Sequence, residues 1–231
     1  MDNLSNKKKE NKSNLVVNPP KKTLEFIDSI LSQQNEVSRY KNLRFTINKG
    51  VFPFERSSRV LADYLSQGVT GNILDMGTGS GIQAIIACKN GANNVLAVDI
   101  DPKAIENTEK NICELNLEDH INVLRSNLFE SVPNQKFDII IANLPFVNCN
   151  YDCQISHLLF DPCYELHERF FNQAREYLSP NGKIVLVDGD IGDKKKLDSL
   201  IKKYNFNISK ETTVSFDELN WNIYEISRRR E

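Results

Sequence analysis

The sequence predicts an α/β protein whose mostly parallel sheet is covered by helices on both faces. From residue 71 onward, short runs of apolar and β-branched residues alternate with patterns typical of helices. Strands that are hydrophobic over their whole length belong to parallel sheets buried on both faces. The last two runs, 206–214 and 222–226, are interpreted as an antiparallel pair. We therefore expect one reversed strand near the C-terminus.

The elements before residue 71 do not follow this alternation. Four apolar residues share one helical face and predict a first helix. Ser57 can cap a second helix that also has an apolar face. Between the two, the run 51–54 (Val-Phe-Pro-Phe) interrupts the helical pattern. The two apolar faces consist of Leu24, Ile27, Ile30 and Leu31, and of Val60, Leu61 and Leu65.

After residue 71 the boundaries of the elements are marked by glycine and proline. The glycine-rich run 77–81 ends the first strand, and Pro102 stands at the favoured first turn of a helix. Pro-Asn-Gly at 180–182 predicts a turn into the following strand. The expected strands are 72–76, 94–99, 121–124, 137–142 and 183–187, and the expected helices begin at residues 82 and 102 and cover 165–178 and 193–203.

Charge and pattern divide the chain into three segments, 1–22, 23–70 and 71–231. The first holds six lysines and two acidic residues, a net charge of +4, while the whole chain carries −2. Residues 23–231 therefore carry −6. We expect a disordered basic tail, a helical or lid segment, and a main domain. The tail offers a contact for RNA, but the acidic body argues against a protein whose main ligand is phosphate.

Composition restricts the class of protein. A chain of 231 residues with 40% hydrophobic residues can bury a core, which excludes a wholly disordered protein. No apolar run approaches the ~20 residues of a membrane-spanning helix, and the start lacks the apolar centre of a secretory signal. Five cysteines, an odd number, are expected as reduced thiols. We expect a cytoplasmic protein without a membrane partner.

The run 75–81, Asp-Met-Gly-Thr-Gly-Ser-Gly, lies between a strand and a helix, where an open α/β sheet places its ligand. Its glycine spacing differs from the Gly-x-Gly-x-x-Gly of dinucleotide folds, and Asp75 would repel a pyrophosphate but suits an ammonium group. Asp99, at the end of the second strand, can accept hydrogen bonds from ribose hydroxyls. A ribose joined to a cationic amino acid, without phosphate, indicates S-adenosylmethionine.

Three runs together resemble a class I S-adenosylmethionine-dependent methyltransferase: 73–84, 97–102 and 143–146. The branch that they resemble most is the release-factor glutamine methyltransferases with their small-domain relatives. The resemblance implies a doubly wound, seven-stranded Rossmann-like sheet with one antiparallel strand, and a methyltransferase domain at 71–231. It also implies cofactor contacts from Asp75, Gly77, Thr78, Gly79, Gly81, Asp99, Ile100, Asn127, Leu128 and Asn143.

Within that set the resemblance assigns separate parts of the cofactor. Asp75, Gly77 and Gly79 match residues that line the methionine end, and Asp99 matches the residue that binds the ribose. Asn127 stands where the family has an acidic residue that meets the adenine amino group. An asparagine carbonyl can still accept from that amine.

The run Asn143-Leu144-Pro145-Phe146 resembles the family's Asn-Pro-Pro-Tyr/Phe motif, which is used on amide and exocyclic amine nitrogens. Such a nitrogen is a poor nucleophile, and two acceptors for its N–H groups can hold it in line for transfer. The Asn143 side-chain oxygen and the Leu144 carbonyl are the candidates. Pro145 keeps Leu144 extended, and Phe146 can lie against a planar acceptor. Alone, the run would also suit a strand-ending turn.

Two further segments each leave two interpretations open. The run 52–54, Phe-Pro-Phe, is either a lid over the cofactor or ordinary core. The second segment holds five potential zinc ligands, but their spacing favours unpaired thiols in a substrate loop, so no metal is expected. These residues are Cys149, Cys153, His157, Cys163 and His167.

The sequence thus predicts an N-methyltransferase with S-adenosylmethionine as cofactor and a protein glutamine as first-choice acceptor. An adenine in RNA or DNA, or a small molecule, is the alternative acceptor, with RNA reached through the basic tail. A non-catalytic S-adenosylmethionine-binding scaffold is disfavoured by the run 143–146. A nicotinamide oxidoreductase is disfavoured by Asp75 and by the glycine spacing.

Overall fold

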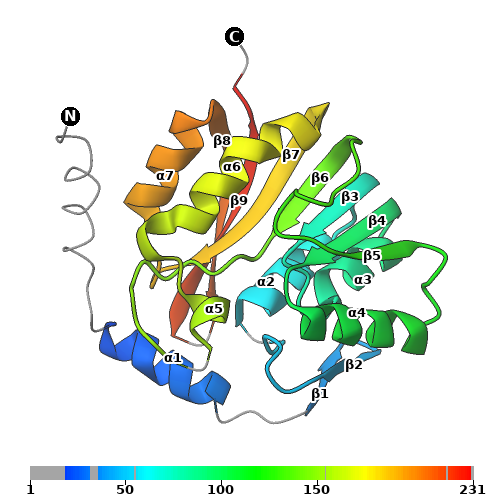
Figure 1. The fold of residues 1–231 in the computed structure, drawn as a ribbon, viewed down its shortest axis with the longest axis horizontal. Coiled ribbons are helices and arrows are strands. Elements are labelled where there is room, and N and C mark those ends of the chain that lie inside the picture. The colour runs from blue at the N-terminus through cyan, green and yellow to red at the C-terminus, as the bar shows by residue number, and fades with distance from the viewer. Residues whose placement is uncertain (1–18, 32–35, 55, 154, 217, 230–231) are drawn as a thin grey trace, which may run out of the picture.

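The computed structural model describes residues 19–31, 36–54, 56–153, 155–216 and 218–229. The expected basic tail lies almost wholly outside these residues. None of the helices in the described part is long and apolar enough to cross a membrane. Figure 1 shows the helices on both sides of a central sheet, with the small hairpin of β1 and β2 next to α4.

The described elements follow one another in the order below, with the labels of Figure 1. They are α1 (Lys21–Leu31), β1 (Glu36–Tyr40), β2 (Leu43–Ile47), α2 (Arg56–Leu65), β3 (Gly71–Met76), α3 (Ile82–Lys89), β4 (Ala92–Asp99), α4 (Pro102–Glu114), β5 (Ile121–Arg125), β6 (Phe137–Ala142), α5 (Ser156–Leu159), the 3₁₀ turn η2 (Pro162–Tyr164), α6 (Glu165–Tyr177), β7 (Leu178–Gly189), α7 (Lys194–Lys203), β8 (Phe206–Phe216) and β9 (Leu219–Arg228).

The large sheet has seven strands in the order β5-β4-β3-β6-β7-β9-β8. The pairings from β5 to β7 are parallel, and β9 runs antiparallel to both β7 and β8. The chain builds the sheet outward from β3 through β4 to β5, and then crosses to β6 on the other side of β3. This confirms the doubly wound, seven-stranded sheet with one antiparallel strand.

The strands are apolar on both faces because each face packs against helices. In β6, Ile139 and Ile141 belong to the core cluster shared with α2 and α3, whereas Ile140 belongs to the cluster shared with α6 and α7. Val185 and Leu186 of β7 divide in the same way. Period-two alternation between two buried faces therefore explains the unbroken apolar runs of the sequence.

The register of the central strands brings three loops to one edge of the sheet. Met76, the last residue of β3, pairs with Val98 of β4 and with Ala142, the last residue of β6. The residues that directly follow these three paired positions are Gly77, Asp99 and Asn143. Because the strands are parallel, the three lie together at the carboxyl edge, next to the point where the order of strands reverses.

The hairpin of β1 and β2 was not predicted from the sequence. Its strands pair antiparallel, with Tyr40 opposite Leu43, and it does not join the large sheet. Two buried asparagines of α4 hold it instead. Asn111 accepts from the N–H of Thr46 at 2.8 Å, and Asn107 accepts from the N–H of Asn48 at 2.6 Å. Side-chain amides thus satisfy backbone groups of β2 and of Asn48, the residue that follows it.

Three expectations about local structure are corrected. In α1, Ile27 and Ile30 are buried as predicted, but Leu24 is 36% exposed, and Phe26, 2% exposed, packs against Trp221 instead. Ser57 is the second residue of α2 and not its cap. The turn at 180–182 lies inside the bounds of β7, as an irregularity in its pairing with β6.

Candidate active site

A cavity of about 310 Å³ lies at the carboxyl edge of the sheet, where β3, β4 and β6 end. Residues after β2, in α2 and in the segment from α5 to α6 complete its walls. All but two of the site residues predicted from the sequence line this cavity. Those that line it are Gly77, Thr78, Gly79, Asp99, Ile100, Asn127, Leu128, Asn143, Leu144, Pro145 and Phe146; Asp75 and Gly81 do not.

The glycine loop after β3 has a backbone that side chains rarely adopt. Gly77, Gly79 and Gly81 have φ angles of 75°, 60° and 81°, values that favour glycine. At Gly81 a Cβ would also lie 2.9 Å from Cγ2 of Thr108 in α4. The last glycine therefore allows α3 to start close against α4, and the first two leave the backbone open toward the cavity.

Asp75 lies behind the glycine loop and is 2% exposed. Its Oδ2 accepts hydrogen bonds from the Thr78 hydroxyl at 2.7 Å and from the N–H of Ala84 at 3.1 Å. Burial raises the pKa of Asp75 to about 7, although both hydrogen bonds act to lower it. Asp75 does not line the cavity. The carboxyl instead ties the loop to the first turn of α3.

Asp99 projects into the cavity from the end of β4. Its Oδ2 accepts from the N–H of Gly79 at 3.0 Å, and its Oδ1 accepts from the N–H of Asp101 at 2.9 Å. Burial raises the pKa of Asp99, while these backbone hydrogen bonds lower it. A carboxylate has about four acceptor sites. Asp99 therefore keeps acceptor capacity for hydroxyl groups of a ligand.

Asn127 lines the cavity, but its amide already has two partners. Its oxygen accepts from Nη2 of Arg169 at 2.9 Å, and its nitrogen donates to Oε1 of Glu130 at 2.8 Å. The oxygen expected to meet an adenine amine is therefore shared with a guanidinium. An amide oxygen has two lone pairs, so one acceptor position is left for a ligand. The sequence motif gave no sign of Arg169, which comes from α6.

Asn143 directly follows β6, and its amide is oriented by a residue from α2. Its Nδ2 donates to Oγ of Ser58 at 3.1 Å, so Oδ1 is the amide atom left for the cavity. No described residue donates a hydrogen bond to that oxygen or to the backbone carbonyl of Leu144. Two unused acceptors thus occur in adjacent residues of one loop.

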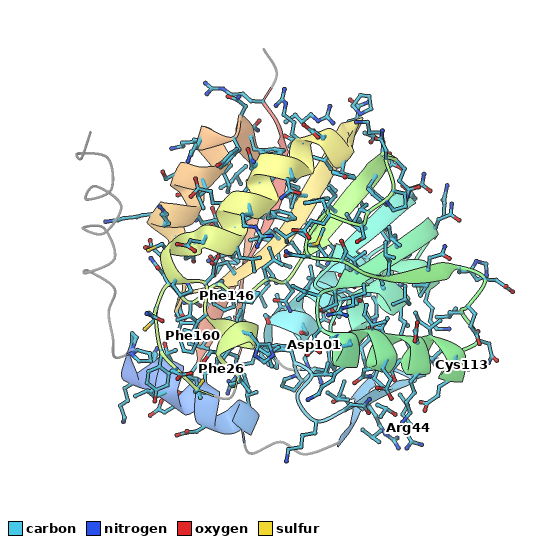
Figure 2. The ribbon with its side chains drawn as sticks, viewed as in Figure 1. Phe26, Arg44, Asp101, Cys113, Phe146 and Phe160 are labelled. Carbon is cyan, nitrogen blue, oxygen red and sulfur yellow. The ribbon has the colours of Figure 1, made fainter. Side chains whose placement is uncertain are left out.

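Phe146 lines the cavity while its ring is fixed from behind. The ring meets that of Trp221 edge-to-face, with centroids 5.9 Å apart and planes at 87°. Its N–H donates to the carbonyl of Leu159 at 3.1 Å. Figure 2 shows Phe146 with Phe160 and Phe26 in the region of α5 and α1. These contacts hold the last residue of the run 143–146 against the core.

The two interpretations of the run 52–54 apply to different residues. Phe52 is half-buried and lines the cavity beside Val51. Phe54 is 3% exposed and packs edge-to-face against Tyr40, with ring centroids 5.7 Å apart. Phe52 is therefore placed to cover a ligand, whereas Phe54 anchors the segment in the core.

The cysteines and histidines of 149–167 do not converge. No group of three or more His, Cys, Asp or Glu residues in the described part of the chain could hold a metal ion. His157 is exposed and lines the cavity, whereas His167 is buried with Nδ1 2.7 Å from Oδ2 of Asp161. The segment supplies a wall of the cavity and buried packing.

Several cavity residues escaped sequence reasoning because no local motif marks them. Ser58, Gln83 and Arg169 come from three different helices. Ser58 lies one residue beyond the serine taken as a cap. Gln83 and Arg169 lie in α3 and α6, and nothing in the sequence singled them out. Only the folded arrangement brings them to the glycine loop and to the run 143–146.

Comparison with known proteins decides the family. Residues 42–212 match the family model described as the methyltransferase small domain. The chain belongs to the methyltransferase small-domain family. The family description identifies residues 42–212 as a methyltransferase domain, whose cofactor is S-adenosylmethionine. The cavity fits this cofactor, because it offers the Asp99 carboxylate for hydroxyl groups and the apolar side chains of Ile100 and Leu128 for an adenine.

Curated relatives of this small-domain methyltransferase include a bifunctional methyltransferase of Rickettsia prowazekii, 33% identical over 59% of this chain and 29% of that protein. The chain thus spans less than a third of that relative. A Methanocaldococcus jannaschii protein, provisionally named a protein N5-glutamine methyltransferase, is 27% identical over 78% of this chain and 93% of its own. A release factor glutamine methyltransferase of Borreliella burgdorferi is 30% identical over 71% and 62%.

Solved structures show the same fold. The ribosomal protein L11 methylase of Lactobacillus delbrueckii subsp. bulgaricus has a TM-score of 0.63 and 21% identity, over 84% of this chain and all of that one. TrmK of M. capricolum, solved with S-adenosylhomocysteine, has a TM-score of 0.56 and 17% identity, over 72% and 67%. At these low identities, the similarity is evidence for the Rossmann-like methyltransferase fold alone.

Proposed function

We propose that this enzyme methylates the side-chain amide nitrogen of a glutamine in a protein. The observation that carries the proposal is the pair of unused acceptors after β6, Oδ1 of Asn143 and the carbonyl of Leu144, beside the glycine loop. An amide NH₂ group has two N–H donors and a delocalised lone pair, so two fixed acceptors suit it. The names of the two glutamine methyltransferase relatives support the same acceptor.

We assign the cofactor to the side of the cavity formed by β3, β4 and β5. The backbone of Gly77 and Gly79 would border its methionine part, and Asp99 would accept from its ribose hydroxyls. Asn127, Ile100 and Leu128 would surround the adenine. Asp75, Thr78 and Gly81 would shape the loop. The bound cofactor supplies a methyl group on a positively charged sulfur, so the protein must supply position and not a strong base.

The acceptor amide would lie against the run 143–146. Asn143 and Leu144 each accept one N–H of its NH₂ group, which fixes the plane of the amide. Pro145 restrains Leu144 to extended backbone and so fixes the direction of the Leu144 carbonyl. Phe146 presents a ring held by Trp221. Phe52, from the segment 23–70, would cover the cavity and exclude water.

The test is transfer of a labelled methyl group from S-adenosylmethionine into cell extract, followed by digestion with protease or nuclease. We expect protease-sensitive label and N5-methylglutamine in the modified peptide by mass spectrometry. Label that resists protease and is released by nuclease would contradict the proposal and identify a nucleic-acid amine as acceptor. Label in small molecules alone would also contradict it.

Two variants separate the proposed roles in the same assay. Asn143→Ala should lower transfer at least 100-fold while cofactor affinity stays within a few-fold, because a misplaced acceptor costs rate and not cofactor contacts. Asp99→Ala should weaken cofactor affinity by at least about tenfold, since it removes a charged hydrogen-bond acceptor. Equal loss of cofactor binding in both variants would refute the role given to Asn143.

A further inference from the structure

Ser58 is the one described side chain that hydrogen-bonds the Asn143 amide. Asn143 can serve as an acceptor for an N–H group only if its oxygen, and not its NH₂, faces the cavity. The terminal torsion of asparagine is broad and roughly two-fold, so the side chain itself does not choose. A neighbouring group has to set the orientation.

Ser58 is placed to do this. It is the third residue of α2, 5% exposed, and lines the cavity. Its Oγ lies 3.1 Å from Nδ2 of Asn143 and accepts from it across 85 residues of chain. Because the NH₂ group of the amide is directed to Ser58, the oxygen is directed to the cavity. The opposite orientation would set two NH₂ groups, those of Asn143 and of the acceptor, against each other.

Ser58 is itself held by a second buried side chain. Gln83, in the first turn of α3, donates from Nε2 to the backbone carbonyl of Ser58 at 3.0 Å. Gln83 is 5% exposed, so this hydrogen bond is protected from competition with water. The start of α3, the start of α2 and the loop after β6 are therefore joined by two hydrogen bonds, of which the one from Gln83 is buried and the one from Asn143 is partly buried.

We propose that Ser58 is a positioning residue that fixes the amide of Asn143 with its oxygen toward the acceptor nitrogen. This rests on the proposed function in that Asn143 receives the acceptor N–H. Ser58 itself takes no part in transfer. Its removal should therefore change the rate of transfer far more than the affinity for the cofactor.

The neighbouring serine provides a matched control. Ser57 is 1% exposed in the same turn of α2, and its Oγ has no hydrogen-bond partner in the described part of the chain. Ser57→Ala removes a buried hydroxyl from α2 without touching Asn143. Ser58→Ala should lower kcat 10-fold to 100-fold, with cofactor Kd within threefold, whereas Ser57→Ala should keep kcat within threefold. Ser58→Thr, which retains the hydroxyl, should recover most of the loss.

A second readout does not depend on activity. In protein labelled with ¹⁵N-asparagine, the side-chain amide signal of Asn143, assigned by its loss in Asn143→Asp, should shift and exchange faster with solvent in Ser58→Ala. Ser57→Ala should leave it unchanged. An unchanged signal in Ser58→Ala, a kcat within twofold of wild type, or a loss of cofactor affinity that matches the loss of rate would each overturn the proposal.

The two proposals fail in different ways. If the wild-type enzyme methylates a nucleic acid or a small molecule instead of glutamine, the function proposed above is wrong. The role of Ser58 can still be tested then, by comparing kcat of Ser58→Ala with kcat of wild type on that acceptor. If Ser58→Ala matches wild type on a glutamine acceptor, the function stands and the positioning role falls.

Discussion

At the scale of single residues, Asp75 combines full burial with a carboxyl group. Burial raises its pKa to about 7 from an ordinary value of 3.8. A proton is therefore bound more tightly in the folded chain than in the unfolded chain between pH 4 and 7. The contribution of Asp75 to the free energy of unfolding therefore falls as the pH rises through this range, because this carboxyl ionises first in the unfolded chain.

Asp75→Asn should remove this contribution. Its side-chain oxygen can still accept from Thr78 and Ala84, but it does not titrate. The stability of the variant relative to wild type should rise between pH 4 and 7, by at most about 4 kcal/mol for a shift of about three pKa units. Urea unfolding of both proteins without cofactor at several pH values measures this difference. If the difference in unfolding free energy between Asp75→Asn and wild type stays constant with pH, the raised pKa of Asp75 is disproved.

Asp188 of β7 provides an independent comparison. Burial also raises its pKa to about 7, and it is 2% exposed. Asp188→Asn should change the pH dependence of the unfolding free energy in the same direction as Asp75→Asn. Since the two carboxyls belong to different strands, their contributions should add in the double variant.

At the scale of elements, the glycine loop sets how closely α3 approaches α4. Gly81→Ala adds a Cβ at 2.9 Å from Cγ2 and 3.2 Å from Oγ1 of Thr108, at a φ of 81°. Gly79→Ala has a similar φ but nothing within 4 Å. Gly79→Ala should cost about 1–2 kcal/mol of stability from backbone strain alone. Gly81→Ala should cost about 2–5 kcal/mol, because overpacking adds to the strain.

Thr108→Ser tests why Gly81→Ala should lose more stability than Gly79→Ala. This change removes Cγ2 but keeps the hydroxyl that donates to the carbonyl of Gly79 at 3.1 Å. Combined with Gly81→Ala, it should recover part of the lost stability in thermal or urea unfolding without cofactor. Equal losses for Gly79→Ala and Gly81→Ala would show that the contact with α4 has no influence.

Elements with one strong period were predictable, and those held by distant side chains were not. The strands β3, β4 and β6 could be predicted from their unbroken apolar runs, which arise because both faces of each strand are buried. In the hairpin β1–β2, only β2 (Leu-Arg-Phe-Thr-Ile) alternates between apolar and polar residues, whereas β1 (Glu-Val-Ser-Arg-Tyr) does not. The hairpin was missed because five-residue strands are weak signals alone, and Asn107 and Asn111 stabilise them from 59 to 65 residues away.

The same division holds for the cavity. Gly77, Asp99 and Asn143 were predictable because each follows a strand, and parallel strands end at one edge. Their hydrogen-bond partners could not be predicted, because a sequence motif contains no information on which helix packs beside it in the fold. Asn127 illustrates the consequence: its position in the family pattern suggested a contact with adenine, and the fold adds Arg169 as a competitor.

At the scale of the whole molecule, the distribution of charge favours the proposed protein acceptor over a nucleic acid. Residues 23–231 carry a net charge of −6 although they include the basic run 228–230, and residues 1–22 carry +4. An enzyme that holds an RNA through phosphates releases counterions, and six to ten such contacts lose about 10³–10⁵ in affinity between 50 and 200 mM salt. A glutamine side chain is neutral and releases none.

For a glutamine-containing protein acceptor we therefore expect kcat/KM to change less than about tenfold from 50 to 200 mM salt. The measurement is initial rates of methyl transfer at subsaturating acceptor over that range, with the cofactor saturating so that its own binding does not contribute. A variant with the lysines at 7–9 changed to serine is the matched control. Its salt dependence should equal that of wild type if the tail does not bind the acceptor. A steep decline that disappears in this variant would instead assign the tail to acceptor binding and favour an RNA.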